Sequence, residues 1–209
     1  MIQKILPNSD TKLRILKAVY KNPEINYSKL VKKSRTSPNI VLKYVNELVK
    51  SNILIEKRLG GKKKTHIRLF KPNFLNLGVD IFSFVELEEK NKFLKKYEKL
   101  APIISQIEGL LLAATKAKFC LIYGSFARFA ADKNSDLDLW LVGNISSIIK
   151  NRIREIFSTF YGEYSMTIEN EKQFLKKTSD SIHQNIIKDH IIIYGEKEFV
   201  KLLKEFNQF

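Results

Sequence analysis

The stretch Phe119–Val142, FCLIYGSFARFAADKNSDLDLWLV, decides the fold of the second half of the chain. It opens with an apolar run, Phe119 to Tyr123, that is typical of a buried strand. The run ends at Gly124-Ser125, and residues 126–131 then favour the start of a short helix. A strand that turns through Gly-Ser into a helix offers backbone N–H groups and a hydroxyl to a phosphate.

Two acids follow this turn after ten intervening residues, in the sequence Asp136-Leu137-Asp138 at the start of an apolar strand. Residues two apart on a strand point to the same face, so the two carboxylates lie side by side. They repel each other unless a cation lies between them, and an oxygen-preferring ion such as Mg²⁺ or Mn²⁺ is the natural one. Two such ligands beside a phosphate-binding turn indicate two-metal phosphoryl or nucleotidyl transfer.

Gly-Ser, ten residues and Asp-x-Asp, with Ser135 before the first acid, resemble the DNA polymerase beta-like nucleotidyltransferase superfamily, and its small "minimal" members most of all. The resemblance covers roughly residues 100 to 200, since the run His190–Glu196 followed by Phe199 is similar to the end of those domains. It implies a small mixed sheet flanked by helices, with Mg²⁺ or Mn²⁺ and an NTP, ATP being the favoured one, as cofactor and substrate. By the resemblance, the metal ligands are Asp136 and Asp138, and the nucleotide phosphates contact Gly124, Ser125 and Arg128.

Two departures from the family pattern leave catalysis open. The family has glycine after the arginine of the turn, whereas this chain has Phe129. Active members also carry a third carboxylate on a later strand, where it binds the catalytic metal and activates the acceptor hydroxyl. The corresponding strand here is Tyr164–Ile168, and its inward residues are predicted to be Ser165 and Thr167. Glu163 takes the third catalytic position only if the register between the strands is shifted. The sequence therefore predicts a nucleotidyltransferase site but leaves open whether it is catalytically active.

The first seventy-odd residues predict three short helices followed by a strand hairpin. The helices are expected from about residue 11 to 21 with Asp10 as N-cap, from 27 to 33 with Asn26 as N-cap, and onward from Ser37. Strands at 53–58 and 65–70 flank a Gly60-Gly61 turn.

This segment resembles the winged-helix family of DNA-binding domains, in which the third helix enters the major groove and the hairpin lies along the phosphates. The resemblance implies groove contacts from the helix link and the third helix, and phosphate contacts from the hairpin. The groove set is Arg35, Thr36, Ser37, Asn39 and Lys43, and the phosphate set is Lys62, Lys63, Lys64 and Arg68. RNA remains an alternative to DNA as the partner.

The distribution of charge supports two modules with different partners. Residues 1–76 hold 18 Lys and Arg against 4 Asp and Glu, whereas residues 77–209 hold 19 against 18. The basic half therefore favours a polyanion as its partner. We expect a winged-helix domain at 1–76, a linker and helix at 77–100 with turns to residue 80, and a nucleotidyltransferase-like domain at 101–209.

Other features set the expected cellular context. Cys120, the only cysteine, excludes a disulfide framework and is expected to be a buried small hydrophobe. With no apolar run near the ~20 residues that span a bilayer, we expect a cytoplasmic protein without a membrane partner. The histidines have no metal-ligand spacing, and His183 and His190 are expected at a helix surface and the start of a strand. A charged helix is expected from about Glu86 to Leu100, and we expect it to pack against the sheet of the second domain, with a helical homodimer seam as the alternative.

Three functional hypotheses follow for this α+β chain. The first is an enzyme that transfers a nucleoside monophosphate from an NTP to a hydroxyl of a protein or nucleic acid while tethered to DNA. The second is a regulator whose nucleotidyltransferase domain no longer turns over and instead senses a nucleotide or mediates oligomerisation. The third is a structural adaptor that joins a nucleic acid to a protein complex. The position of the third carboxylate separates the first two.

Overall fold

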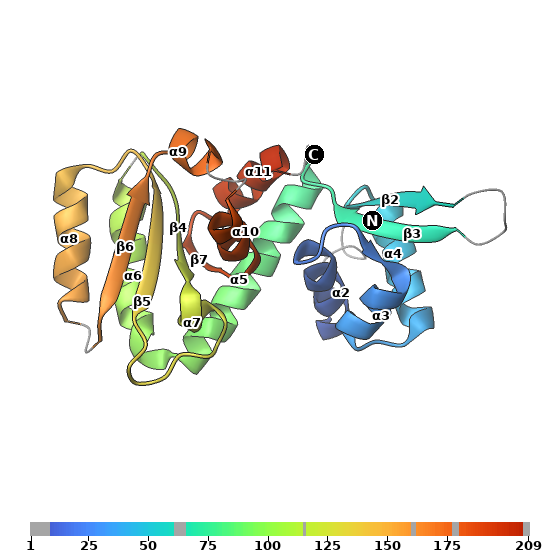
Figure 1. Ribbon diagram of the computed structural model, residues 1–209, viewed down its shortest axis with the longest axis horizontal. Helices are drawn as coiled ribbons and strands as arrows, with labels where there is room; N and C mark the ends of the chain where they lie inside the picture. Colours follow the sequence, from blue (N-terminus) through green and yellow to red (C-terminus); the bar gives the residue numbers. More distant parts are fainter. Residues whose placement is uncertain (1–8, 61–65, 115, 160–161, 177–179, 207–209) are drawn as a thin grey trace. The chain divides into compact units, whose positions relative to one another are not determined.

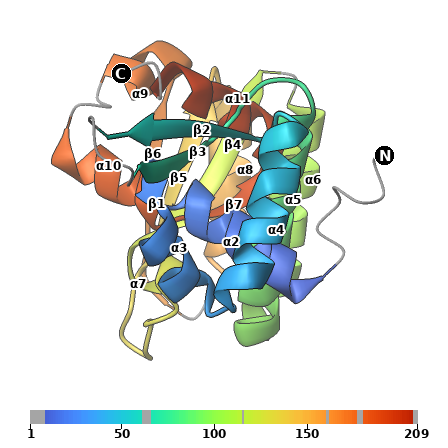
Figure 2. The ribbon, with the colours of Figure 1, turned by 90° about the vertical axis from the view of Figure 1, so that its right-hand side faces the viewer.

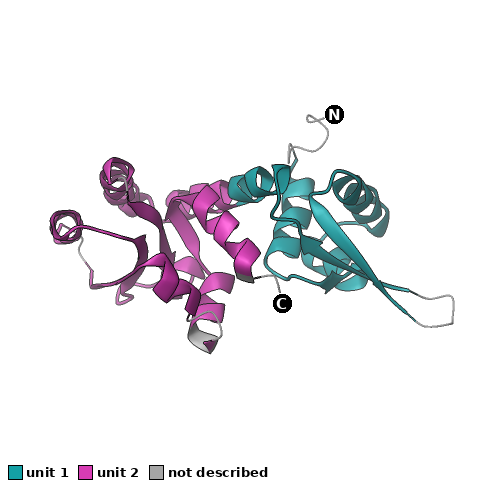
Figure 3. Ribbon diagram, turned by 90° about the horizontal axis from the view of Figure 1, so that it is seen from above, with its two compact units in different colours: residues 1–85 teal, residues 86–209 magenta. Residues whose placement is uncertain are grey.

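The computed structural model describes residues 9–60, 66–114, 116–159, 162–176 and 180–206 (Figure 1). The chain divides into two compact units, residues 1–85 and residues 86–209 (Figure 3). No helix in the described ranges is long and apolar enough to cross a membrane.

The first unit is a three-helix domain with a small antiparallel sheet. Its elements in chain order are α2 (Asp10–Tyr20), β1 (Ile25–Asn26), α3 (Tyr27–Ser34), α4 (Pro38–Lys50), β2 (Leu54–Leu59) and β3 (Ile67–Pro72). The sheet order is β1-β3-β2, and the helices lie on one side of the β2–β3 hairpin (Figure 1 and Figure 2). Because Leu16, Val45 and Phe70 are fully buried, the three helices and the sheet share one core.

Side-chain caps fix the starts of the helices, and one differs from the prediction. Asn26 accepts a hydrogen bond from the amide of Lys29 at 2.8 Å, as expected for the cap of α3. The predicted cap of α2, Asp10, is wrong, because Ser9 has the extended backbone and accepts from the amide of Lys12 at 3.3 Å. Asp10 is then the first helical residue, where its negative charge favours the helix N-terminus.

The predicted linker to residue 80 is shorter than expected. Helix α5 spans Leu77–Lys96, so it starts about nine residues before the predicted helix and takes in Gly78. Its first turns are held by buried apolar side chains, and Phe82 packs on Tyr20 with ring centroids 5.2 Å apart. Tertiary burial therefore outweighs the weak helix propensity of glycine at this point.

The second unit contains a four-stranded mixed sheet. Its elements after α5 are η1 (Glu98–Leu100), α6 (Ala101–Ala113), β4 (Ala117–Tyr123), α7 (Gly124–Ala127), β5 (Leu137–Gly143), α8 (Ser147–Phe157), β6 (Tyr164–Glu169), α9 (Glu171–Lys176), α10 (Ser181–Lys188), β7 (Ile191–Tyr194) and α11 (Glu196–Phe206). The sheet order is β6-β5-β4-β7, in which only β5 and β6 run parallel. This mixed sheet confirms the predicted α+β class.

Side chains along β5 alternate between the two faces of the sheet, and each face packs against a different layer of helices. Leu137, Leu139 and Leu141 point into an apolar core with α6 and α8. The opposite face carries Asp138 and Trp140 and is covered in part by α9, α10 and α11 (Figure 1). Trp140 is 3% exposed, and its ring lies 5.2 Å from that of Phe174. The acids therefore share a face with an aromatic cluster and not with the aliphatic core.

The two histidines of this unit are more buried than expected. His183 is buried against Trp140 with ring centroids 4.5 Å apart, so its predicted place on a helix surface is wrong. His190 precedes β7 as predicted, but it is buried and its Nε2 lies 2.9 Å from Oε1 of Glu86 on α5. Lys90 of the same helix donates to the carbonyl of Ile193 at 2.9 Å. These contacts anchor the second half of α5 to β7.

Cys120 lies in the middle of β4 and is buried, as predicted. Burial raises the pKa of its thiol to about 12, since the thiolate cannot be solvated there. The residue is therefore a small hydrophobe of the core and is chemically inert at neutral pH.

Candidate functional site

Asp138 lies at the meeting point of three strands. On β5 it is paired with Tyr123 of β4 on one side and with Ser165 of β6 on the other. Its Oδ1 accepts a hydrogen bond of 2.6 Å from the Ser165 hydroxyl. Asp136 comes directly before the strand, is exposed, and belongs to the same face by alternation. The two acids are thus presented together at the edge of the sheet where β5 begins.

Gly124 supports the carboxylate of Asp138 from the other side. Its φ is +74°, a left-handed conformation in which a Cβ is disfavoured, and a Cβ added here would overlap Oδ2 of Asp138. Ser125 follows, half-buried, at the second position of the short helix α7. Glycine is therefore required at 124 by the backbone and by the neighbouring acid together, which ties the Gly-Ser turn directly to Asp-x-Asp.

The remainder of the turn is specific to this chain. Arg128 follows α7 with an exposed side chain. Phe129 then has φ +58°, the left-handed conformation that explains a glycine at this position in related sequences. Its ring packs 6.2 Å from Phe93 and 6.4 Å from Tyr97, and its carbonyl accepts from Lys96. Contacts with α5 therefore offset the backbone strain of about 1 kcal/mol.

The strand β6 lacks an acid opposite Asp138. Ser165 has that position, and Thr167 follows on the same face by alternation, so neither inward residue is acidic. Glu163 is exposed and comes before β6, where its carbonyl accepts from the amide of Leu137 at 2.9 Å. Extending the β5–β6 register by one residue brings it beside Asp136. The Ser165–Asp138 hydrogen bond was not predicted, because the sequence gives alternation within a strand but not the register between strands.

The donors present fit a divalent cation that also binds a substrate. Within the described ranges, no three His, Cys, Asp or Glu side chains form a group that could hold a metal by themselves. Mg²⁺ in proteins is commonly held by one or two carboxylates, with phosphate oxygens and waters completing its octahedron. Asp136 and Asp138 supply such a pair, although Ser165 already occupies one oxygen of Asp138.

The predicted groove residues of the first unit lie together around the link between α3 and α4. Arg35 ends α3 with a left-handed φ of +50°, and Ser37 is the exposed N-cap of α4 without a side-chain cap bond. Asn39 and Lys43 are both exposed on α4, whereas Thr36 is half-buried and donates to the carbonyl of Ser34 at 3.0 Å. Lys62, Lys63 and Lys64 lie outside the described residues.

Arg68 lies on β3 within a network of side chains. Its guanidinium pairs with both oxygens of Glu56, at 2.7 and 3.1 Å, and also donates to Asn46 of α4 at 2.8 Å. The hydrogen bond from Arg68 holds the pKa of Glu56 below its ordinary value, and Arg58 adds to the effect. Arg68 thus connects the hairpin to α4, and its charge is largely compensated within the domain.

Glu56→Gln is expected to destabilise the first unit by about 1 kcal/mol at pH 7, after allowance for solvent screening of the pair. Because the pKa of Glu56 is lowered by folding, its contribution is present above the ordinary value of 4.5 and is lost as the pH falls below it. The difference from wild type should therefore shrink between pH 5 and 3. Urea unfolding at several pH values measures this.

Glu24→Gln is the matched control, since the Glu24 side chain is 55% exposed and its Oε1 lies 3.9 Å from Nζ of Lys57. It should change the free energy of unfolding by less than about 0.5 kcal/mol at either pH. Equal losses of unfolding free energy in the two variants would show that the change in net charge, and not the loss of the pair with Arg68, causes the destabilisation.

Comparison with known families agrees with this geometry. Residues 105–199 match the family model described as polymerase beta, nucleotidyltransferase. Residues 8–55 match a model described as winged helix-turn-helix DNA-binding. No curated protein matches the chain. Both resemblances stated from the sequence are therefore confirmed at the level of the family.

Proposed function

Because this chain joins a winged helix-turn-helix DNA-binding domain to a polymerase beta-type nucleotidyltransferase domain, we propose that it transfers a nucleoside monophosphate from an NTP to a hydroxyl while tethered to DNA. The observation that carries the proposal is the place of the Asp138 carboxylate, held between Gly124 and Ser165 at the start of β5. The acceptor hydroxyl belongs to a protein or a nucleic acid.

Each residue of the turn has a role in this proposal. Gly124 and Ser125 contact the outer phosphates of the NTP, with Arg128 beside them. Asp136 and Asp138 hold Mg²⁺ or Mn²⁺, which when bound neutralises charge on the triphosphate. The acceptor oxygen attacks the α-phosphorus in line, a new P–O bond forms, and pyrophosphate leaves. Glu163 accepts the hydroxyl proton, since the extended register brings it beside Asp136.

The direct test is incubation with labelled ATP, CTP, GTP or UTP and Mn²⁺, with duplex DNA, RNA and a cell extract as acceptors. We expect one NTP to label an acceptor, and EDTA to abolish the labelling. An absence of labelling with every NTP, together with measurable NTP binding, would contradict the transfer reaction and favour the second function.

That second function is a nucleotide-sensing or oligomerising transcriptional regulator, with a homodimer as one form. It is favoured by Ser165, which stands opposite Asp138 where an active site would have its third acid. A site without this acid could still bind the metal–triphosphate complex through Asp136 and Asp138.

Ser165→Asp is expected to raise the transfer rate about tenfold, because it places an acid opposite Asp138 at the position of a general base. If wild type binds NTP without transfer, the variant should show transfer above background. Ser165→Asn, of similar volume, is the control and should give no gain. A rate that falls in both variants would assign Ser165 a role of its own.

For the first unit we propose duplex DNA as the partner, with α4 in the major groove. Lys43 belongs to the set expected to face the groove, so Lys43→Gln should weaken duplex binding about tenfold at low salt and reduce the difference in affinity between duplexes of different sequence. Lys99 is exposed in η1 of the other unit, and Lys99→Gln should leave both quantities unchanged. Fluorescence anisotropy with a panel of duplexes measures them, and tighter binding of duplex RNA than of DNA would overturn the choice of partner.

A further inference from the structure

A second pocket lies at the opposite end of the strand that carries Asp138. It has a volume of about 430 Å³ and is formed where β5 and β6 end and α8 begins. Asp138 is near the start of β5 and Gly143 is its last residue, so the two sites are roughly 17 Å apart along the strand. The pocket therefore does not belong to the proposed nucleotide site, and a volume of this size suits a small molecule.

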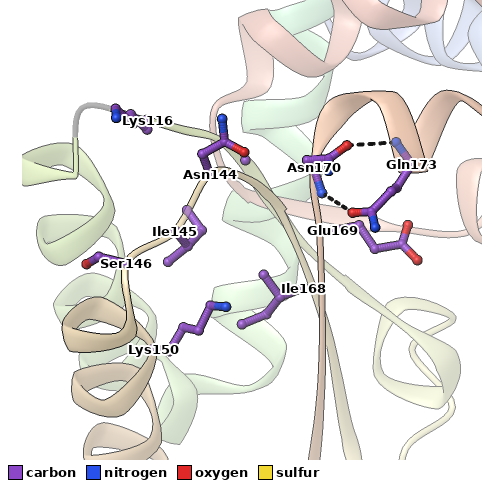
Figure 4. Close-up of a pocket in the computed structure, with 10 residues that line it drawn as sticks. Lys116, Asn144, Ile145, Ser146, Lys150, Ile168, Glu169, Asn170 and Gln173 are labelled. Atoms are coloured by element: carbon purple, nitrogen blue, oxygen red, sulfur yellow. Dashed lines mark hydrogen bonds between the residues drawn. The ribbon is translucent and has the colours of Figure 1, made fainter.

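The pocket has an apolar floor and a basic, amide-bearing rim. Ile145 and Ile168 form the floor, and Figure 4 shows the amino group of Lys150 extended toward Ile168. Lys116 and Asn144 lie on the rim. An apolar surface beside hydrogen-bond donors favours a ligand with two chemically different ends.

The two lysines are not neutralised by the surrounding protein. Neither Lys116 nor Lys150 forms an ion pair with an acid in the described part of the chain, whereas the neighbouring Lys118 lies 3.6 Å from Glu171. Glu169 also lines the pocket, but alternation on β6 directs it to the face opposite Ile168, and Figure 4 shows its carboxylate turned away from Lys150. The pocket is therefore suited to an anion.

The side-chain oxygens of the rim are already used within the protein. Asn170 and Gln173 exchange two backbone–side-chain hydrogen bonds of 2.9 Å, and Ser146 caps α8 by accepting from the amide of Ile149 at 3.4 Å. Because the helix start is capped, it is not what attracts a ligand. The donors left to bind one are the lysine amines and the side-chain NH2 groups of Asn144, Asn170 and Gln173.

We propose that this pocket binds a small molecule that carries a phosphate group and a flat apolar part. Phosphate carries up to two negative charges and three acceptor oxygens, which suit the amine of Lys150 and the amide donors of the rim better than the single charge and two oxygens of a carboxylate. The apolar part lies on Ile145 and Ile168, where it removes their side chains from water. The pocket is a ligand site separate from the Gly124–Asp138 turn. Its binding of a ligand does not depend on whether that turn is catalytic.

Phenyl phosphate, which combines a phosphate with a flat ring, is the probe. In an NMR titration of the full chain we expect saturable shifts at Gly143, Asn144 and the Ile168 methyl groups. Lys150→Gln should raise the dissociation constant at least tenfold. Arg154→Gln, a charge loss on the same helix at a residue that does not line the pocket, should change it less than twofold. Inorganic phosphate should bind at least fivefold more weakly, since it has no apolar part.

Three outcomes would show that the pocket is not a ligand site of this kind. They are the absence of saturable shifts, equal affinity in Lys150→Gln and wild type, and shifts centred on Gly124 and Asp138. Equal affinity for inorganic phosphate and phenyl phosphate would remove the role of the apolar floor and overturn the ligand class. The unliganded spectrum of Lys150→Gln should match that of wild type, which separates loss of binding from loss of folding.

Discussion

Asp138→Asn is expected to lower nucleotidyl transfer about a thousandfold while leaving the fold intact. Asparagine keeps the volume of the side chain and an Oδ1 that accepts from Ser165, so the contacts seen at 2.6 Å survive. What is lost is the negative charge that, in the proposed function, would hold the cation beside the triphosphate. A thousandfold loss corresponds to about 4 kcal/mol of transition-state stabilisation, within the range for removal of a metal ligand. Transfer of labelled NTP in Mn²⁺ measures the loss, and thermal unfolding checks the fold.

Asp132→Asn is the matched control because it makes the same change of charge in the adjoining loop. Asp132 accepts from the amide of Asn134 and the hydroxyl of Ser135, both at 3.0 Å, and asparagine can accept both bonds. Its activity should stay within about threefold of wild type, since a single exposed charge contributes little. If Asp138→Asn retained a tenth of the activity, the metal site would not depend on Asp138.

Gly124→Ala is expected to weaken binding of the metal–NTP complex about a hundredfold and to destabilise the second unit by about 2 kcal/mol. The left-handed backbone costs an alanine about 1–2 kcal/mol, and its Cβ meets Oδ2 of Asp138. The acid must therefore rotate away from the position in which it faces the turn. Equilibrium binding of a fluorescent NTP in Mn²⁺ measures the first effect, and urea unfolding measures the second.

Gly109→Ala provides the comparison, because Gly109 lies in helix α6 and nothing stands within 4 Å of its added Cβ. Removing glycine from a helix interior should stabilise the unit by up to about 1 kcal/mol and leave binding unchanged. The two variants are thus expected to move stability in opposite directions. Similar behaviour of both would mean that the conformation of the Gly124 turn has no part in binding.

Features that depend on neighbouring residues in the chain could be predicted from the sequence. The cap at Asn26, the strand before Gly124 and the position of Gly124 beside Asp138 arise from local propensity, alternation and spacing. In each case the residues that cause the feature lie within about fifteen positions of one another, so the feature can be predicted without knowing the rest of the chain.

Features that depend on distant residues could not be predicted. Gly78 looked like part of a linker because the burial of Phe82 against Tyr20 comes from a contact sixty-two residues away. His190 is buried because its Nε2 forms a hydrogen bond with Oε1 of Glu86, which lies 104 residues earlier in the chain. The partner of Asp138 on β6 depends on strand register, and a slip of one residue would turn Ser165 to the other face.

The position of Trp140 has a consequence for spectroscopy. It is the single tryptophan of the chain, and it lies two residues from Asp138 on the same face, with its ring 6.1 Å from that of Tyr123. Tryptophan emission therefore reports on the second unit alone, because the first unit contains no tryptophan. A red shift during denaturation follows the exposure of one sheet, and the proposed cation at Asp136 and Asp138 predicts that added Mn²⁺ quenches this emission.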